Sequence, residues 1–332
     1  MFKDKIFLIT GGTGSLGVAL TKRLLSLGVK QIRIFSRNEF KQISMESEIQ
    51  DERLRFLIGD VRDQKRLKRA IEDVDIVFHA AAMKHVPKVE YNPFEAIKTN
   101  VEGSQNVIEA CLENNVEKAI CIGTDKAVSP LNTYGATKLL MEKLFVNAQQ
   151  YSNPKKHPTK FIAVRYGNVF GSSGSVIPKF IQQLKNKEHL TITDEQMTRF
   201  SITMEQALDF ILKATELGNG TEIFIPKLKS YDLIQVKNIL FDLFGKTDSK
   251  NVGIRPGEKL HETLINVDEM RSAWLYNDVY MILKDEFSNN YLQETYTGIS
   301  KLNISSSYSS DNSEKLSDDE LKKTILDANM IN

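Results

Sequence analysis

The chain has 332 residues, 41% of them hydrophobic, with 44 Lys and Arg against 43 Asp and Glu and a formal net charge of +1. This balance excludes a bulk electrostatic attraction to nucleic acid or to an anionic membrane, so local groups must hold any charged ligand. The length suits two ordinary domains, or one large α/β domain with an appended lobe.

No segment has the pattern of a targeting or membrane-spanning sequence. The apolar run I-F-L-I before Thr10 is too short for a signal-peptide core, and no stretch approaches the roughly 18 apolar residues of a spanning helix. Cys111 and Cys121 fall in a predicted helix and a predicted strand, as small core residues of a reducing compartment do. The five histidines show no paired spacing with these cysteines. We therefore expect a cytoplasmic protein with no metal site and no nucleic-acid or membrane partner.

The first predicted strand, Ile6 to Thr10, leads into the glycine-rich turn G-G-T-G-S-L-G and then into an amphipathic helix. Glycines let the backbone approach a pyrophosphate, whose charge the amides and dipole of the helix N-terminus then stabilise. The order of strand, turn and helix favours a dinucleotide site over a tight turn without ligand. The cofactor contacts expected in this turn are Gly11, Thr13, Gly14, Ser15, Leu16 and Gly17.

The second predicted strand, Gln31 to Phe35, is followed by Ser36 and Arg37. An NAD-preferring protein usually carries an acidic residue here for the ribose 2′-hydroxyl, whereas a guanidinium suits a 2′-phosphate. Lys41, about a turn into the next helix, would add positive charge. The sequence therefore predicts NADP as the cofactor, with an exposed loop arginine as the alternative interpretation of Arg37.

Two further strands are predicted, Leu54 to Ile58 and Ile76 to His79. Small methyl groups follow the second of them and leave room for a cofactor's ribose and nicotinamide. Cofactor contacts are therefore expected from Ala80, Ala81 and Ala82. Lys84 could reach a substrate from this strand edge. A long helix from about Phe94 through Asn114 carries Asn100, another expected cofactor contact.

The fifth predicted strand, Ile120 to Gly123, is a short apolar run of the kind that is buried on both faces. Thr124, Asp125 and Lys126 follow it at the carboxyl edge, where open parallel sheets bind ligands. A lysine beside an aspartate can supply a base and a proton donor. We expect desolvation, Lys138 and a positive nicotinamide to lower the pKa of Lys126, because a lysine acts as a base only when neutral. An exposed charged turn is the alternative.

The next predicted helix, which Thr133 can cap, carries Tyr134 and Lys138 on one face. An ammonium beside a phenol stabilises the phenolate, so we expect Lys138 to lower the pKa of Tyr134 and make it a usable base. The Tyr-x-x-x-Lys spacing alone is a weak signal, since it also occurs as a solvated pair. Strands and helices alternate throughout this part, which predicts an α/β fold with a Rossmann-type doubly wound parallel sheet.

The rest of the chain is predicted to form a smaller, interleaved lobe and an extension. A strand from Phe161 to Tyr166 precedes it, and the lobe's elements are helices near Met204 to Thr215 and Tyr231 to Phe244 and a strand at Thr221 to Ile225. After about Lys284 the composition is loop-like, until Ser317 can cap a short helix through Leu326. We divide the chain into an NADP-binding domain (1–166), a mainly substrate-binding lobe (167–284) and a C-terminal extension (285–332).

Several motifs together resemble the inverting UDP-N-acetylglucosamine 4,6-dehydratases of the polysaccharide biosynthesis protein family, in the extended short-chain dehydrogenase/reductase superfamily. They are G-G-T-G-S-L-G, I-G-D-V-R-D, H-A-A-A-M-K-H-V-P, T-D-K, Y-G-A-T-K, R-Y-G-N-V-F-G-S-S-G-S-V-I-P, M-T-R-F and R-P-G-E-K-L-H-E. The resemblance extends from about Lys5 to about Glu262 and implies cofactor contacts near the adenine from Asp60 and Val61.

The resemblance also implies where the substrate binds. It places Asn168 at the sugar or diphosphate and the segment from Ser175 to Pro178, with Val176, beside the nucleotide. Arg199 and Arg255 suit a diphosphate because a guanidinium binds oxygens bidentately, although each alone is more often a surface ion pair. Glu258 completes the expected substrate contacts.

The implied reaction oxidises C4 of the sugar, eliminates water and returns hydride to C6, with a catalytic set of Thr124, Asp125, Lys126, Tyr134 and Lys138. At the matching strand edge, related epimerases have a sequence similar to Ser-Ser-Ala and retaining dehydratases one similar to Asp-Glu. By this resemblance, the Asp-Lys of this chain implies inversion at C5. The product would serve pseudaminic-acid-like glycans or another deoxysugar polymer, and the resemblance suggests a homo-oligomer, a hexamer. A nucleotide-sugar epimerase, a retaining dehydratase and a non-catalytic NADP-binding regulator are the alternatives.

Overall fold

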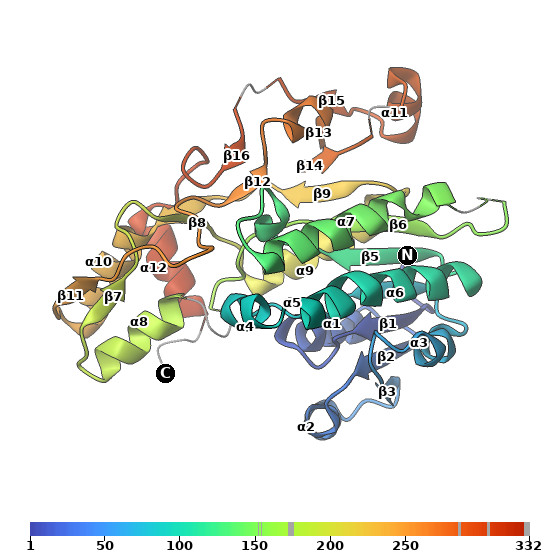
Figure 1. Cartoon of the computed structure of the whole chain (residues 1–332), viewed down its shortest axis with the longest axis horizontal. Helices are drawn as coiled ribbons and strands as arrows, with labels where there is room; N and C mark the ends of the chain where they lie inside the picture. The colour runs from blue at the N-terminus through green and yellow to red at the C-terminus, as the bar shows by residue number, and fades with distance from the viewer. Residues whose placement is uncertain (152, 154, 172–175, 285–286, 304–305, 329–332) are drawn as a thin grey trace.

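The computed structural model describes residues 1–151, 153, 155–171, 176–284, 287–303 and 306–328, and within them a ten-stranded sheet forms the centre of the molecule (Figure 1). Seven neighbouring strands are parallel, in the order β3 (Leu54–Ile58), β2 (Gln31–Ser36), β1 (Ile6–Thr10), β4 (Ile76–His79), β5 (Lys118–Ile122), β6 (Lys160–Val164) and β9 (Ile223–Pro226). Three antiparallel strands extend the sheet beyond β9, namely β14 (Val279–Ile282), β13 (Ala273–Tyr276) and β15 (Ser300–Lys301). The order 3-2-1-4-5-6 is that of dinucleotide-binding sheets, so the predicted Rossmann-type fold is confirmed.

Helices cover both faces of the sheet because successive strand residues point to opposite sides. Phe7 and Ile9 of β1 belong to one hydrophobic core and Leu8 to another. The first core includes residues of α1 (Ser15–Ser26), α2 (Glu39–Ile49) and α9 (Met204–Leu217). The second includes residues of α3 (Gln64–Ile71), α6 (Gly103–Glu113) and α7 (Thr133–Tyr151). Cys111 and Cys121 are both buried in this second core, as predicted.

A smaller lobe lies at one end of the molecule, at the left of Figure 1. Its core brings together Phe180, Leu240, Leu321 and Ile325. These residues come from α8 (Val176–Lys185), α10 (Leu233–Phe244) and α12 (Asp318–Asp327). Two two-stranded sheets complete this region, namely β7 (Leu190–Ile192) with β11 (Ser249–Asn251) and β8 (Thr198–Phe200) with β10 (Ser230–Asp232). A third, β12 (Thr263–Ile265) with β16 (Tyr308–Ser309), packs on the central sheet instead, because Leu264 and Ile265 belong to the second core.

Three predicted boundaries need correction. The helix expected from Phe94 through Asn114 is α5 (Pro93–Ala96), a π-helical segment (Ile97–Glu102) and α6, and it follows the short helix α4 (Val86–Tyr91). The carboxamide of Asn132, not Thr133, caps α7 by accepting from the Gly135 amide at 2.8 Å. The tail is more than a loop before its last helix, because it contains α11 (Asn289–Thr295), β15 and β16. Its strands pair with partners from other parts of the chain, and local composition does not encode such pairing.

The last helix is confirmed with its predicted cap. Ser317 accepts from the amide of Glu320, and the Glu320 side chain accepts from the Ser317 amide, which forms a capping box. Leu321 and Ile325 of this helix are buried in the lobe core, so the end of the chain and the lobe share one core. The division at residues 166 and 284 stays a prediction. Among the described residues, no helix is long and apolar enough to cross a membrane.

Candidate active site

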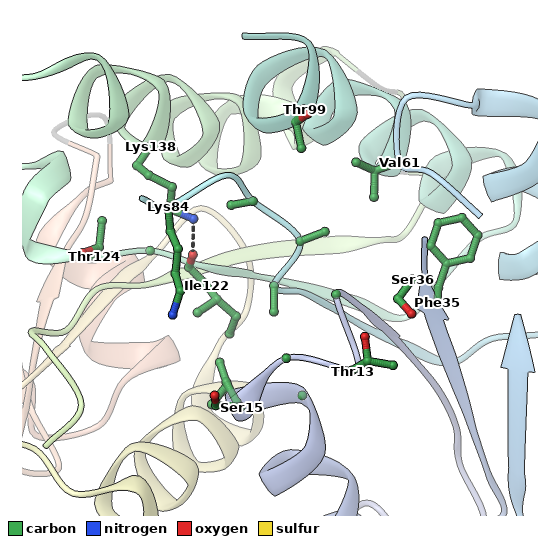
Figure 2. Close-up of a pocket in the computed structure, with 18 of the residues that line it drawn as sticks. Thr13, Ser15, Phe35, Ser36, Val61, Lys84, Thr99, Ile122, Thr124 and Lys138 are labelled. Atoms are coloured by element: carbon green, nitrogen blue, oxygen red, sulfur yellow. Dashed lines mark hydrogen bonds between the residues drawn. The ribbon is translucent and has the colours of Figure 1, made fainter. Parts of the chain in front are cut away.

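A cavity of about 560 Å³ opens at the carboxyl edge of the parallel sheet, where the strand order reverses between β1 and β4 (Figure 2). Ligands of open α/β sheets bind at such a reversal. The predicted cofactor residues in its wall are Gly11, Thr13, Gly14, Ser15, Leu16, Gly17, Ser36, Arg37, Lys41, Asp60, Val61, Ala80, Ala81, Ala82, Tyr134 and Lys138. Thr124, Lys84 and Asn168 line it as well. The structure thus gathers segments from the ends of six strands, β1 to β6, around one space.

The glycine turn after β1 fits a pyrophosphate. Gly11 has φ +68°, and a Cβ there would lie 2.9 Å from the backbone of Ala81. A Cβ on Gly17 would lie 2.4 Å from the carbonyl oxygen of Gly12. Gly14, at the N-cap of α1, provides no side-chain cap, so the first amides of the helix are available to an anion. A nicotinamide dinucleotide matches this donor set and the length of the cavity wall.

Arg37 stands at the outer end of the cavity with its side chain 58% exposed. Its guanidinium lies 3.6 Å from Asp60, which also pairs with Arg62 at 2.7 Å. Burial raises the pKa of Asp60, but hydrogen bonds from Arg62 and the charge of Arg37 outweigh burial and hold that pKa below its usual value. Asp60 therefore stays ionised and orients the guanidinium groups of Arg37 and Arg62.

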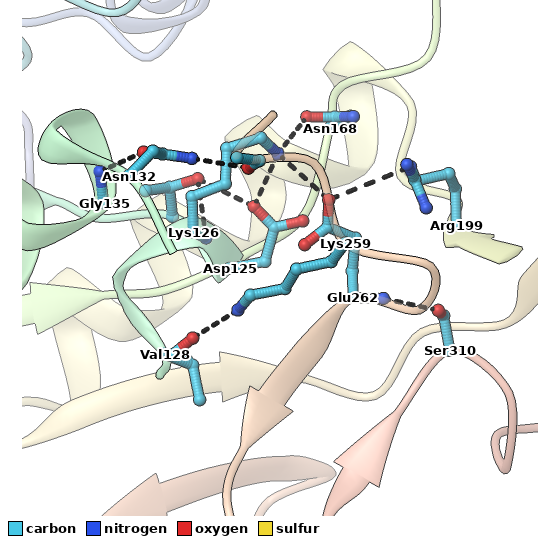
Figure 3. Close-up of polar contacts among 12 residues, drawn as sticks. Asp125, Lys126, Val128, Asn132, Gly135, Asn168, Arg199, Lys259, Glu262 and Ser310 are labelled. Carbon is cyan, nitrogen blue, oxygen red and sulfur yellow. Dashed lines mark hydrogen bonds and ion pairs between the residues drawn. The ribbon is translucent and has the colours of Figure 1, made fainter. Parts of the chain in front are cut away.

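The strand edge after β5 holds an ion pair between the buried Asp125 and the partly buried Lys126 (Figure 3). Asp125 is 1% exposed, and its Oδ1 accepts from the Thr124 hydroxyl at 2.8 Å and from the Lys126 ammonium at 3.1 Å. Lys126 also donates to Oδ1 of Asn168 at 2.9 Å. The other oxygen of Asp125, Oδ2, has no hydrogen-bond partner within the described residues. A buried acceptor without a donor is costly, so it favours a bound hydroxyl that would donate to it.

The pKa of Lys126 is shifted in the direction opposite to the predicted one. Burial alone lowers it, but the carboxylates of Asp125 and Glu262 outweigh burial, and the net pKa lies above the usual value. The expected lowering is therefore wrong. Asp125 has the larger effect, and Glu262, a second carboxylate that the sequence pattern did not place here, adds to it.

Tyr134 and Lys138 line the same cavity but are not paired as predicted. Burial raises the pKa of Tyr134, and the cation that opposes this effect is Lys126. The Lys138 ammonium instead donates to the carbonyl of Ile122 at 2.6 Å and contacts the sulfur of Met141 at 3.1 Å (Figure 2). The expectation that Lys138 lowers the pKa of Tyr134 is therefore not met.

The remaining predicted residues lie around the cavity rather than in its wall. Asn100 is fully buried, and its carboxamide bonds both backbone groups of Met83 and the hydroxyl of Thr137. Arg255 and Glu258 form a turn whose Gly257 carbonyl accepts from Asn132 at 2.8 Å. Val176 begins α8. Ser175 lies outside the described residues.

Arg199 is the predicted site residue whose surroundings differ most from expectation. It is 8% exposed, and its Nη1 donates to the carbonyls of Thr198 and Leu260 at 2.6 and 3.0 Å. Its Nε faces Glu262 at 3.8 Å. The guanidinium is thus part of the charged cluster around Lys126.

Sequence reasoning missed two members of this cluster, Glu262 and Lys259. Glu262 is 4% exposed and lies 3.6 Å from the Lys126 ammonium. Lys259 donates to the carbonyl of Val128 (Figure 3). Both belong to the stretch R-P-G-E-K-L-H-E, whose alternation of charge and turn residues was the available signal. In the part of the chain that is described, no three His, Cys, Asp or Glu residues form a group that could hold a metal ion.

Comparison with known proteins gives a consistent result. The family described as polysaccharide biosynthesis protein matches residues 7–284. The chain is 45% identical, over 98% of both sequences, to a UDP-N-acetylglucosamine 4,6-dehydratase (inverting) from Campylobacter jejuni. It is 42% identical to a UDP-glucose 4-epimerase from Rickettsia conorii, over 98% of this chain and 96% of the relative. Among solved structures, Pen from Bacillus thuringiensis matches with a TM-score of 0.90 and 38% identity over 99% of each chain.

Proposed function

The chain belongs to the polysaccharide biosynthesis protein family, and we propose that it is an NADP-dependent UDP-N-acetylglucosamine 4,6-dehydratase that inverts C5. The observation that carries this proposal is the ion pair of the buried Asp125 with Lys126, beside the cavity that Tyr134 lines. The Campylobacter jejuni relative, 45% identical over nearly the whole chain, supports the same substrate and stereochemistry.

The cofactor would lie along the glycine turn and the three alanines, with Arg37 and Lys41 at its 2′-phosphate. When bound, it would supply the hydride acceptor for C4 and return that hydride to C6. Tyr134, in its phenolate form, would take the proton of the C4 hydroxyl as C4 becomes a ketone. The Lys138 ammonium, held by the Ile122 carbonyl, would anchor the ribose at the inner end of the cavity.

The ketone acidifies the neighbouring C5–H bond, and the Asp125–Lys126 pair then serves both halves of the elimination. The Lys126 ammonium lies 3.1 Å from Oδ1 of Asp125. Transfer of one proton across this contact produces the two required species, a neutral amine and a carboxylic acid, without a change in net charge. Lys126 then takes the C5 proton, while Asp125 donates its proton to the C6 hydroxyl, which leaves as water.

A 4-epimerase is the second candidate, because relatives with that name are 42% identical to the chain. Such an enzyme needs the tyrosine and the cofactor but removes no C5 proton and no water. An epimerase would give Asp125 and Lys126 no chemical task, although Asp125 is buried and paired with the partly buried Lys126. The dehydratase therefore explains more of the site.

The test compares Lys126→Met with the wild type on UDP-N-acetylglucosamine, with products identified by NMR. We expect the wild type to form a 4-keto-6-deoxy sugar and Lys126→Met to bind NADP normally but to lose this product. Lys250→Met, the same substitution at an exposed position of β11, serves as the control. Unchanged product formation by Lys126→Met would contradict the role of the pair. NADP preference, a cytoplasmic location and a homo-oligomeric state belong to the proposal as predictions.

A further inference from the structure

A second buried carboxylate faces the ammonium of Lys126 from the loop before β12. Glu262 is 4% exposed, and its Oε1 lies 3.6 Å from the Lys126 ammonium and 3.8 Å from Nε of Arg199 (Figure 3). The other oxygen, Oε2, has no hydrogen-bond partner among the residues that the structure describes. A carboxylate that is buried without its full set of donors is costly, so its position between two cations calls for a role.

Neighbouring groups fix Glu262 on both sides. Arg199 cannot easily turn away, because its Nη1 is held by two backbone carbonyls and its Nη2 contacts the sulfur of Met197 at 2.8 Å. The backbone of Glu262 forms two hydrogen bonds with Ser310, at 2.9 Å from its amide and 2.8 Å to its carbonyl. Arg199 and Ser310 therefore hold Glu262 in its position next to Lys126, and neither of them belongs to the proposed catalytic set.

The same loop is attached directly to the strand edge. Lys259 donates to the carbonyl of Val128, and the Asn132 carboxamide donates to the carbonyl of Gly257 at 2.8 Å. Asn132 also caps α7, the helix that carries Tyr134. The loop, the Asp125–Lys126 turn and the start of α7 thus form one hydrogen-bonded unit.

We propose that Glu262 is a positioning residue for the C5 step: it holds the Lys126 ammonium against Asp125 and Asn168 and fixes its charge until substrate is bound. The Lys126 ammonium donates to Asp125 at 3.1 Å and to Asn168 at 2.9 Å, and the Glu262 carboxylate forms an ion pair with it at 3.6 Å. The inference rests on the proposed function, because it assigns Lys126 the C5 proton.

The charge of Lys126 depends on groups from several elements. Besides Glu262, the titratable or charged groups that interact with it are Asp125 on its own turn, Tyr134 on α7, Arg199 on β8, Tyr231 on β10 and Lys259 on the loop. The carboxylates raise the pKa of Lys126 and the cations lower it. Removal of the Glu262 charge leaves Asp125 as the nearby carboxylate, so the amine form of Lys126 becomes accessible at lower pH.

The test uses Glu262→Gln, which keeps the shape of the side chain and removes its charge. We expect binding of NADP and UDP-N-acetylglucosamine, measured by calorimetry, to stay within about threefold of the wild type, because Glu262 contacts neither in this account. The variant should still oxidise C4, which is measured by the near-ultraviolet absorbance of the reduced cofactor. Exchange of the C5 hydrogen in D₂O should slow by roughly tenfold or more, and its pH profile should move to lower pH.

Two further variants distinguish a loss of Lys126 positioning from a general disturbance of the protein structure. Glu262→Asp, which keeps the charge, should restore part of the C5 exchange rate. Glu195→Gln, the same charge change at an exposed position, should match the wild type. An unmoved pH profile in Glu262→Gln, or equal losses of C4 oxidation and C5 exchange, would overturn the proposal.

Failure of the proposed function gives a different pattern. A wild type that exchanges no C5 hydrogen would refute the dehydratase assignment, whatever Glu262 does. In that case the ¹⁵N NMR signal of the Lys126 ammonium, assigned with Lys126→Met, decides the inference. A changed signal in Glu262→Gln supports the positioning of Lys126 by Glu262, and an unchanged signal overturns it.

Discussion

Lys126 is a residue of the site with many charged and polar neighbours, and these come from several parts of the chain. It lies between two carboxylates, beside Asn168 and near the phenol of Tyr134. The carboxylates keep it charged without substrate, and the short contact to Asp125 offers its proton a nearby acceptor. The same ammonium is the cation that opposes the effect of burial on Tyr134. In the proposed mechanism, Lys126 would therefore take part in both the oxidation and the elimination.

Tyr134→Phe should bind cofactor and UDP-sugar but lose C4 oxidation. Removal of one proton-transfer group commonly lowers a rate by roughly 10² to 10⁴. The ring is buried against Val89 and Ala96, and phenylalanine preserves this packing. Single-turnover kinetics with calorimetric binding controls measure the effect. Turnover close to that of the wild type would mean that the hydroxyl is only structural.

Arg37→Asp should reverse or abolish the predicted preference for NADP over NAD. The substitution places a carboxylate near Asp60, where a 2′-phosphate would meet two negative charges. Calorimetry of both cofactors with the wild type and the variant tests this prediction. Equal affinities of the wild type for the two cofactors would remove its basis.

Most residues of the cavity wall could be predicted from the sequence because they directly follow a strand in the chain. Glycine turns, small residues and strand ends carry local signals, and the parallel sheet brings them to one edge. Glu262 could not be assigned in this way, since it meets Lys126 only through the packing of a loop far along the chain. The predicted pKa directions of Lys126 and Tyr134 are wrong for different reasons. At Lys126 the charges of the adjacent Asp125 and then of the distant Glu262 outweigh burial, whereas at Tyr134 burial outweighs the cation.

At the scale of elements, a buried cluster behind the site joins β6, α7 and the turn at Glu269–Ser272. The Arg165 guanidinium is fully buried and bonds Glu142 at 2.5 and 3.0 Å. It also bonds Glu269 at 2.9 Å and the carbonyl of Leu264 at 2.8 Å. This cluster fixes α7, and therefore Tyr134, against the segment that follows Glu262.

Arg165→Met should lower the free energy of unfolding by about 3–5 kcal/mol, because it leaves the Glu142 carboxylate buried without its cation. Burial raises the pKa of Glu269, but the Arg165 charge outweighs it and holds that pKa below the ordinary value of 4.5. The stabilisation by this pair is therefore present above about pH 4.5 and is lost as pH falls through the folded-state pKa. Urea unfolding at neutral and acidic pH measures both effects. A loss below about 1 kcal/mol at neutral pH would contradict the account.

Local pattern predicted the elements of the first half better than those of the tail. Strands buried on both faces and their intervening helices have strong periodic signals, and the predicted strands β1 to β4 match the structure closely. The π-helical segment interrupts the long predicted helix where the Asn100 side chain bonds Met83 and Thr137. These are tertiary contacts, so they cannot be predicted from the helical periodicity of the sequence.

At the scale of the whole molecule, the tail is part of two cores. Its β15 extends the central sheet, and α12 completes the lobe. A further link is Glu222, buried at the start of β9, which accepts the hydroxyl of Tyr296 at the end of α11. The last residues therefore contribute to the packing of both the sheet and the lobe.

Glu222→Gln should flatten the dependence of stability on pH. Burial raises the pKa of Glu222 to about 7, against hydrogen bonds from Tyr296 and from backbone amides. Its contribution to stability is therefore full below the unfolded-state pKa and is lost as pH rises through about 7, on the order of 3 kcal/mol. Calorimetric melting at pH values on either side of this transition compares the variant with the wild type and with the exposed control Glu294→Gln. An unchanged pH dependence in Glu222→Gln would show that another group causes it.

The most direct test of the central claim is the stereochemistry of the first product from UDP-N-acetylglucosamine in D₂O. The purified protein is incubated with NADP, and the early product is trapped before slow epimerisation and analysed by NMR. The account predicts a 4-keto-6-deoxy sugar of L-arabino configuration, with one solvent deuterium at C5 and the C4 hydride transferred to C6. An early product of D-xylo configuration would contradict inversion at C5, and a C4 epimer formed without loss of water would contradict the dehydratase itself.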